Sequence, residues 1–245
     1  MNRGYYTAAQ AMINQQRILD AISNNVSNVN TAGYRADEIV TNTFQEELYL
    51  VTNRTETSGT YYQTYVDSSS TSLEQGSFEY TGSRYDIAIY GNLYFNIRHE
   101  NGNVYQTRNG QFELDNEGYL ILGRSGRVQG QNGDIYLGSH DFVIKENGQI
   151  VTDDGVIDSL MLTYIPETAD VDKFGENLYT YLGGEQLPEN ESYAVIQGAF
   201  EKSNVDSVKE MTQAMEAQRM YEANSKILQY FDTINRRAAQ EIAQI

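Results

Sequence analysis

The chain has 245 residues, and 17 lysines and arginines stand against 34 aspartates and glutamates, which gives a formal net charge of −17 at pH 7. A surface this acidic repels phosphate backbones and anionic lipid headgroups, so no nucleic-acid partner is expected. The lack of cysteine excludes disulfides, a cysteine nucleophile and thiolate metal sites. No apolar run approaches the roughly 20 residues that cross a bilayer, and the N-terminus lacks a secretory pattern, so we expect a soluble chain without direct membrane insertion.

Residues 1–35 are predicted to form an N-terminal helical segment. Seam residues recur at alternating spacings of three and four, which is the 3.5-residue period of a coiled coil, before Gly33 offers a stop. The seam consists of Tyr5, Ala8, Met12, Gln15, Leu19, Ile22, Val26 and Val29. Polar residues surround this narrow stripe, so the helix needs a partner along the stripe and either water or a second, polar interface elsewhere.

Residues 36–75 match neither a helical nor a strand period, and they are dense in threonine, serine, asparagine and tyrosine. A connector of about 40 residues is unusual inside a compact domain. We therefore expect an extended arm that is ordered only by its neighbours.

Residues 76–200 are predicted to form an antiparallel β core domain. Short apolar runs alternate here with turn dipeptides, namely Asn-Gly at 101–102, 109–110, 132–133 and 147–148 and Asp-Gly at 154–155. The expected strands cover 85–89, 94–97, 111–114, 119–122, 142–145 and 160–165. No long helices alternate with these runs, so a doubly wound sheet is not expected.

Residues 201–245 are predicted to form a C-terminal helix, with an N-cap supplied within 203–206. Its seam repeats the N-terminal spacing through Ala214, Ala217, Tyr221, Asn224, Leu228, Phe231, Asn235, Ala238, Ile242 and Ile245. A second row, formed by Met220, Ile227 and Ile234, flanks this seam at sevenfold spacing and widens the apolar stripe. The predicted fold class is therefore α+β, an antiparallel β core flanked by two heptad-bearing helices that pair in an assembly.

The terminal helices are expected to need partners. A helix of roughly 27 residues is about 40 Å long, which exceeds the width of a small β domain. Ordering its backbone also costs more free energy than burial of the seam returns. We expect both ends to be poorly ordered in a monomer and helical in an assembly. The alternative left open is an intramolecular helix pair that caps the β domain.

The search for catalytic or metal-ligating residues yields no convincing constellation. His99 and His140 are interpreted as ordinary surface residues. Acidic turns at 115–118 and 153–158 leave calcium open, but Arg124 stands where an EF-hand loop requires a bidentate glutamate, and hairpin turns are favoured. No cofactor, no metal and no enzymatic activity are predicted.

Five sequence blocks resemble the bacterial flagellar rod and hook family. Residues 22–34, ISNNVSNVNTAGY, are similar to its N-terminal signature A-N-N-L-A-N-x-N-T-x-G-[FY], and residues 105–120, YQTRNGQFELDNEGYL, resemble its hairpin Y-T-R-x-G-x-F-x-x-D-x-x-G-Y-L. The other blocks lie at 75–91, 198–205 and 216–224, in the family's order. One departure is the run NLYF at 92–95, where the family usually shows D-G-F-F or G-F-F, which implies a different turn.

The resemblance implies a structural subunit of the rod in the flagellar basal body, similar to the distal and proximal rod members and more to the distal type. It implies export through the flagellar export apparatus without a cleaved signal peptide, followed by polymerisation outside the cytoplasm. The implied product is a helical tube that transmits torque, built from copies of the chain and other rod and hook proteins. A different class, left open, is a secreted module dimerised by its helices, with a ligand face on the β domain.

The implied assembly interface combines seam positions with signature positions near the inner ends of both helices. These residues are Tyr5, Met12, Leu19, Ile22, Asn25, Val26, Asn28, Asn30, Gly33, Ser203, Asn204, Val205, Tyr221, Asn224, Leu228, Phe231 and Ile242.

Overall fold

The structure is a computed structural model that describes residues 3–43, 64–138, 141–152, 155–166, 169, 171–175, 177–181, 183 and 192–242. It divides into two compact units, which are described separately. The helical unit comprises residues 1–27, 37–70 and 206–245, and the β unit comprises residues 28–36 and 71–205.

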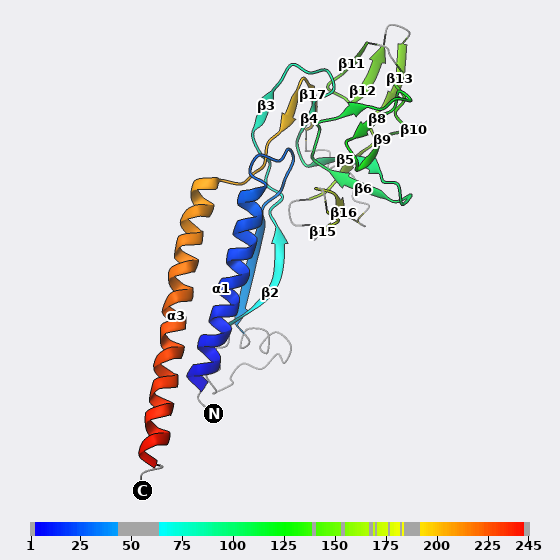
Figure 1. The fold of residues 1–245 in the computed structure, drawn as a ribbon. Helices are drawn as coiled ribbons and strands as arrows, with labels where there is room; N and C mark the ends of the chain where they lie inside the picture. The colour runs from blue at the N-terminus through cyan, green and yellow to red at the C-terminus, as the bar shows by residue number, and fades with distance from the viewer. Residues whose placement is uncertain are drawn as a thin grey trace. The chain divides into compact units, whose positions relative to one another are not determined.

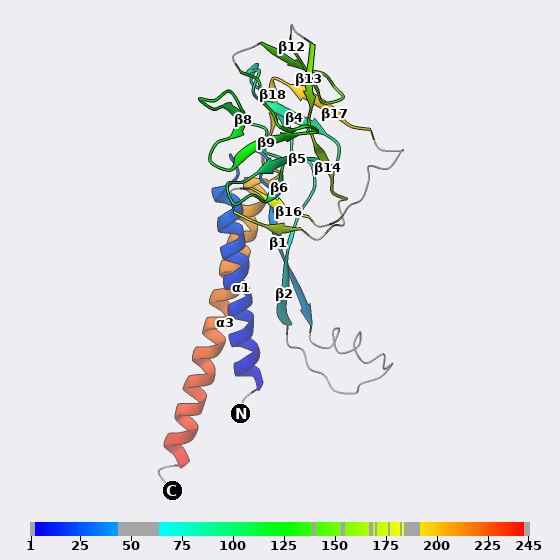
Figure 2. The same cartoon turned by 90° about the vertical axis from the view of Figure 1, so that its right-hand side faces the viewer.

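The helical unit is built on two antiparallel helices that pack side by side (Figures 1 and 2). Its elements are α1 (Arg3–Ser27), α3 (Ser207–Ile242) and the strands β1 (Asp37–Thr43) and β2 (Thr64–Thr71), which pair in a two-stranded sheet. Gly4 lies against the ring of Phe231, where an added Cβ would come within 2.8 Å, while Asn25 contacts Glu210. The helix pair therefore forms within one chain, which is the alternative that the sequence left open.

The N-cap of α3 explains where this helix begins. The Asp206 carboxylate accepts hydrogen bonds from the backbone N–H groups of Val208 at 2.9 Å and Lys209 at 3.2 Å. These two amides belong to the first turn and have no intrahelical acceptor. The N-cap predicted within 203–206 is confirmed.

The β unit contains short strands, and every strand pairing described in it is antiparallel. They are β3 (Phe78–Tyr80), β4 (Ile87–Tyr90), β5 (Leu93–Arg98), β6 (Val104–Thr107), β7 (Glu113–Leu114), β8 (Leu120–Leu122), β9 (Gly126–Gly130), β10 (Gly133–Asp134), β11 (Phe142–Ile144), β12 (Gln149–Thr152), β13 (Gly155–Ser159), β14 (Leu162–Tyr164), β15 (Asp172–Lys173), β16 (Tyr179–Thr180), β17 (Ala194–Gln197) and β18 (Ala199–Glu201). Each predicted strand run overlaps one of them, so the predicted α+β class is confirmed.

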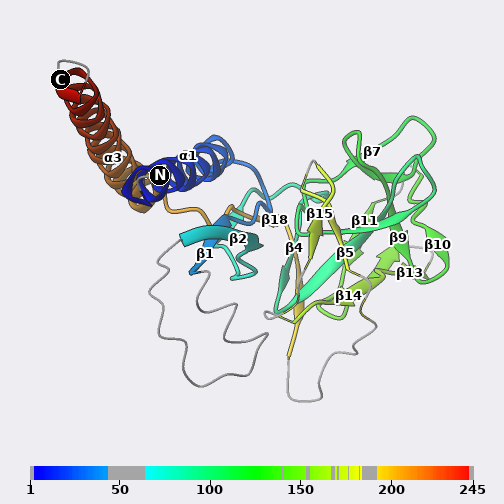
Figure 3. The same cartoon turned by 90° about the horizontal axis from the view of Figure 1, so that it is seen from below.

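Within the described residues the largest sheet has nine strands, in the order β15-β16-β6-β5-β9-β8-β7, with β10 paired to β9 and β14 paired to β5. Smaller sheets are β11-β12-β13, β17-β4 and β18-β3 (Figures 1 and 3). One main hydrophobic cluster fills the unit, with Ile87, Ile97, Leu120 and Val128 inaccessible to solvent. Residues 93–97 of β5 are all buried, so this strand has protein on both faces.

Three of the four Asn-Gly pairs lie at turns between strands, as predicted. Gly102 and Gly148, with φ of 84° and 82°, lie in the β5–β6 and β11–β12 turns, and Gly133 pairs with Gly130 at the β9–β10 turn. Asn109-Gly110 is not a hairpin turn, and that prediction is wrong. Gly110 instead permits close approach of β4, because an added Cβ would lie 1.6 Å from the Ile87 carbonyl oxygen. The Asp-Gly pair at 154–155 lies partly outside the described residues.

The acidic turn at 115–118 is stabilised from within the chain. Its Asp115 carboxylate accepts hydrogen bonds from the backbone N–H groups of Glu117 and Tyr119, both at 2.8 Å, as a turn-forming aspartate does. Among the described residues, no three histidine, aspartate or glutamate side chains are grouped so as to hold a metal ion. His140 and residues 153–154 lie outside the described part. Neither described helix is long and apolar enough to cross a membrane.

Candidate functional site

The α1–α3 seam buries only part of the stripes identified in the sequence. Ala8, Ile22 and Asn25 of α1 and Ala217 of α3 are buried. The other proposed interface positions on the helices are partly buried, namely Met12, Leu19, Val26, Tyr221, Asn224, Leu228 and Phe231. Tyr5 is 42% exposed, and the side chain of Ile242 lies outside the described part. The seam positions up to Phe231 thus lie along the contact between the two helices of a single chain, whereas Asn235 and Ala238 are exposed.

The second apolar row of α3 remains open to solvent. Met220, Ile227 and Ile234 are 59%, 43% and 60% exposed, and Tyr230 beside them is 69% exposed. Residues seven apart lie on one helix face, so these side chains form a continuous apolar row along the helix. α1 covers one stripe of α3 and leaves this adjacent row uncovered. Exposed apolar rows of this kind are typical of protein contact surfaces.

Asn25, a residue of the N-terminal signature, links three segments of the helical unit. Its Oδ1 accepts a hydrogen bond from the Asp37 backbone N–H at 2.9 Å, and its Nδ2 donates to the Asp37 carbonyl at 3.0 Å. The same Nδ2 donates to Glu210 Oε1 at 3.4 Å. Burial raises the pKa of Glu210, which the Asn25 hydrogen bond opposes only in part. Asn25 therefore joins α1, β1 and α3 through its side chain alone.

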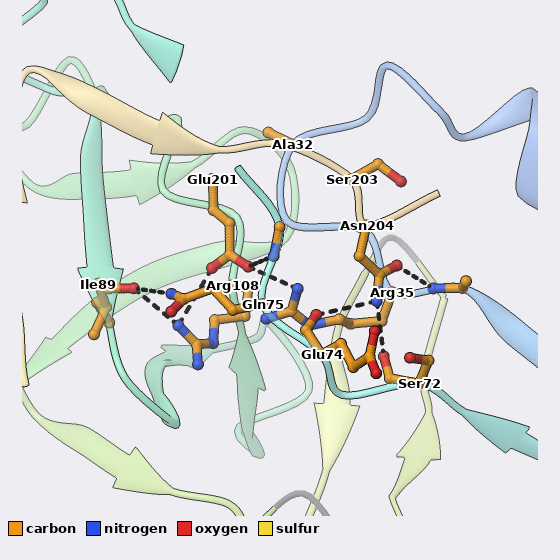
Figure 4. A network of polar contacts seen from close by, with 12 residues as sticks. Ala32, Arg35, Ser72, Glu74, Gln75, Ile89, Arg108, Glu201, Ser203 and Asn204 are labelled. Carbon is orange, nitrogen blue, oxygen red and sulfur yellow. Dashed lines mark hydrogen bonds and ion pairs between the residues drawn. The ribbon is translucent and has the colours of Figure 1, made fainter. Parts of the chain in front are cut away.

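A buried ion cluster lies at the centre of the signature blocks in the β unit (Figure 4). Arg35 Nη1 lies 2.6 Å from Glu201 Oε1, and Arg108 Nη1 lies 3.3 Å from Glu201 Oε2. All three side chains are at most 1% exposed. The Gly76 backbone N–H donates to Glu201 Oε1 at 2.8 Å. One buried carboxylate thus pairs with two buried guanidinium groups.

Within this cluster, burial and the Glu201 carboxylate act in opposite directions on the pKa values of the two arginines. Burial opposes the charge of Arg35, but the nearby Glu201 carboxylate raises the pKa of Arg35 overall. Burial lowers the pKa of Arg108 despite the same carboxylate. Arg108 also donates to the carbonyl oxygens of Ile89, at 3.0 Å, and Gly91, and its guanidinium lies 4.5 Å from the centroid of a tyrosine ring. Removing the Glu201 carboxylate would leave both guanidinium groups buried without a counter-charge.

Asn204 joins neighbouring segments of the β unit. Its Oδ1 accepts from the Ala36 backbone N–H at 2.8 Å, while its Nδ2 donates to the carbonyl oxygens of Ser72 and Glu74, both at 3.1 Å (Figure 4). Val205 next to it packs against Ala36 in a small cluster. This signature asparagine therefore supplies the polar contacts that hold the β unit's first and last segments together.

Other signature positions act locally within the β unit. Gly33 has φ 65°, and its N–H donates to the Glu201 carbonyl at 2.8 Å. Asn28 accepts a hydrogen bond from Thr31 Oγ1 at 3.2 Å, Ser203 Oγ accepts from the Val205 N–H at 3.2 Å, and Asn30 is exposed. The structure thus places the signature residues Gly33, Asn204 and Val205 in intramolecular contacts.

Sequence reasoning assigned no role to Arg35, Arg108 or Glu201. Each lies in or next to a block that resembles the family, and this position is the only feature of the sequence that indicates a role for them. Charged residues in short strands and turns are usually solvent-exposed, and a periodicity argument cannot identify the few that are buried together. The three residues pair because the fold brings distant segments of the chain into contact.

Three family models match the chain in order. They describe a flagella basal body rod protein at residues 6–35, a flagellar hook protein FlgE/F/G D1 domain at 88–152, and a flagellar basal body rod FlgEFG protein C-terminal region at 196–241.

Relatives match over nearly their whole length. The flagellar basal-body rod protein FlgG of Bacillus subtilis is 31% identical over 261 residues, which cover 96% of this chain and 97% of the relative. The flagellar hook-basal body complex protein FlhO of the same species is 29% identical over 100% of both chains, and FlgF of Caulobacter vibrioides is 27% identical over 100% of both.

A pair of terminal helices and an antiparallel β core, together with these matches, define a structural protein of the flagellar hook-basal body complex. The chain belongs to the flagellar basal-body rod protein family. It is a structural, non-enzymatic subunit of the basal-body rod, as the sequence predicted.

Proposed function

We propose that this chain polymerises within the rod through α1 and α3. The observation that carries the proposal is the open apolar row formed by Met220, Ile227, Ile234 and Tyr230, which α1 leaves uncovered. In this mechanism the seam positions pair α1 with α3 inside each copy, and the open row contacts the next copy. Contact between two different surfaces of identical subunits generates an open helical polymer when the rotation between copies does not close into a ring.

The product of this polymerisation is a helical tube that transmits torque through its wall. Other copies of the chain and neighbouring rod and hook proteins are its partners. Long helices whose apolar rows complete their burial only in the tube resist bending and separation, because both expose apolar surface. In this proposal α1 and α3, from the segments expected at 1–35 and 201–245, form the wall.

Export without a cleaved signal, as an unfolded chain through the flagellar export apparatus, fits the properties of the sequence. The absence of cysteine prevents accidental cross-linking outside the cytoplasm. A net charge of −17 keeps separate copies soluble before they meet the growing tube.

The test places one negative charge at three adjacent positions of α3. Ile227→Glu alters the open row, Leu228→Glu alters the partly buried seam, and Gln229→Glu adds the same charge at an exposed polar position. Each variant replaces the wild-type chain in the source bacterium, and basal bodies are viewed by electron microscopy alongside swimming assays. We expect Ile227→Glu and Leu228→Glu to abolish rods and Gln229→Glu to build them. Normal rods with Ile227→Glu would refute the role of the open row.

A further inference from the structure

A groove of about 450 Å³ lies inside the helical unit, between α1, β1 and α3. The charged side chains that line it are the carboxylates of Asp37, Glu38, Glu210 and Glu216, with the ammonium of Lys209 as the single positive charge among them. Its remaining lining is uncharged, including the apolar residues of both helices. The groove therefore attracts cationic groups.

Glu210 points to the same kind of occupant by an independent observation. Its side chain is 9% exposed, and its Oε1 accepts the 3.4 Å hydrogen bond from Asn25. Its Oε2 is buried and has no hydrogen-bond donor among the described residues. A buried carboxylate oxygen without a donor is unfavourable by itself, whereas a guanidinium or ammonium beside it would supply the missing hydrogen bond.

A row of cationic side chains lies on another face of α3. Arg219, Lys226 and Arg237 are exposed, and their spacings of seven and eleven residues place them on one side of the helix. This side lies opposite Ala217, which is buried in the α1 contact. None of the three cations has an ion-pair partner among the described residues. The chain thus presents a basic row despite its large negative charge.

The two surfaces have matching axial spacings. Glu210 and Glu216 are six residues apart, or about 9 Å along the helix, and Arg219 and Lys226 are seven apart, or about 10 Å. A parallel neighbouring α3 displaced by about 14 Å would bring both cations level with both carboxylates along the helix axis. Arg219 and Lys226 form no ion pair with the carboxylates of their own helix among the described residues, so both remain available to the carboxylates of another copy.

We propose that the acidic groove receives the basic row of a second copy of this chain, with Arg219 of one copy pairing with Glu210 of the next and Lys226 with Glu216. This contact rests on the proposed polymerisation and adds its axial register. An apolar row tolerates sliding, since its residues resemble one another, whereas discrete charge pairs favour a single displacement. The ion pairs therefore fix how far each subunit is shifted along its neighbour.

The absence of cysteine allows a direct test by cross-linking in rods. The double variant Glu216→Cys/Lys226→Cys places both thiols on exposed positions of α3, about 15 Å apart along one helix. A disulfide needs Cα atoms within about 7 Å, so this pair can be joined only between copies. The matched control, Lys226→Cys/Asp232→Cys, keeps the basic-row thiol and moves its partner to an exposed acidic position outside the groove.

Basal bodies carrying each double variant are oxidised, or treated with a short bifunctional thiol reagent, and separated by denaturing electrophoresis. We expect a ladder of dimers and higher oligomers from the first pair, with at least about tenfold less cross-linking in the control and in dilute monomer. Rods that assemble without this ladder would overturn the charge contact while leaving polymerisation intact. A cross-link to a different protein, identified by mass spectrometry, would overturn the assignment to a second copy.

Charge exchange provides a second readout if loss of both charges in the cysteine pair prevents assembly. Glu216→Lys should lower the number of completed basal bodies about tenfold, and Glu216→Lys/Lys226→Glu should restore it to within about twofold of wild type. Failure of the exchanged pair to recover would refute the pairing. Failure of the wild-type chain to enter rods would instead refute the proposed function.

Discussion

Arg35 and Glu201 form a 2.6 Å ion pair in which neither side chain is more than 1% exposed. Arg35 directly follows the N-terminal signature, and Glu201 belongs to the block that precedes α3. The pair therefore joins the segments through which the chain enters and leaves the β unit. The ion pair therefore holds the first and last segments of the β unit together, and both partners belong to the same chain.

Glu201→Gln should destabilise the β unit strongly. The substitution removes the carboxylate that compensates Arg35 and Arg108 and leaves two buried guanidinium groups without a counter-charge. Breaking a buried pair in this way costs about 3–5 kcal/mol. Urea unfolding of the full chain, followed by tyrosine fluorescence, measures the free energy of unfolding. Glu79→Gln is the control, because Glu79 pairs with Lys202 at 3.3 Å on the surface and should change that free energy by about 1 kcal/mol or less.

Gly33→Ala should also destabilise the β unit, for a steric reason. Gly33 has φ 65°, and an added Cβ would lie 2.3 Å from the Asn109 nitrogen and 2.4 Å from the Arg108 carbonyl carbon. Backbone strain and the clash together should cost more than about 2 kcal/mol. Gly102→Ala isolates the first contribution, because Gly102 has φ 84° and open space at the Cβ position, and it should cost about 1–2 kcal/mol. Equal losses in urea unfolding would show that the close approach is unimportant.

The pKa of Glu210 predicts a pH dependence in the helical unit. Burial raises this pKa above the ordinary value of 4.5, so the folded chain binds the proton more tightly than the unfolded chain does. Protonation of Glu210 therefore stabilises the folded state below about pH 4.5, and that stabilisation is lost as the pH rises through the folded-state pKa. The groups that act on this carboxyl are Asn25 of α1, Glu38 of β1, and Asp206 and Lys209 beside it.

Glu210→Gln should raise the melting temperature of the helices at neutral pH and leave it nearly unchanged below about pH 4.5. The variant keeps the size of the side chain and removes the charge that burial disfavours. Circular dichroism melts of the dilute full chain between pH 4 and 8 measure the effect. Glu216→Gln removes an exposed carboxylate from the same helix and should leave the pH profile as in wild type. A variant that is less stable than wild type at neutral pH would contradict the assigned cause.

The sequence predicted those elements that depend on local pattern. Heptad spacing located both helices, and the Asn-Gly pairs at 101–102 and 147–148 located hairpin turns, because both signals arise from neighbouring residues. The Asn-Gly pair at 109–110 was misinterpreted as a hairpin turn. A glycine is also required where another strand packs closely against the backbone, and for Gly110 that strand contains Ile87, which is distant in the sequence. The cluster around Glu201 could not be predicted, since burial of a charge depends on partners elsewhere in the chain. The seam residues were identified, but their spacing does not say whether the partner helix is in the same chain.

The C-terminal end of α3 should be the least stable part of the described helices. Figures 1 and 2 show α3 continuing past the N-terminal end of α1, and residues 232–240 are all exposed. An isolated helix end without packing frays, because local hydrogen bonds barely offset the lost backbone entropy. Hydrogen exchange should therefore be fast for amides of 232–242 in dilute monomer and at least about a hundredfold slower in assembled rods. Residues 210–224, which include Ala217 buried in the α1 contact, serve as the internal control and should be protected in both states. Equal protection of the helix end in monomer would contradict the expectation that this segment is stabilised only in the tube.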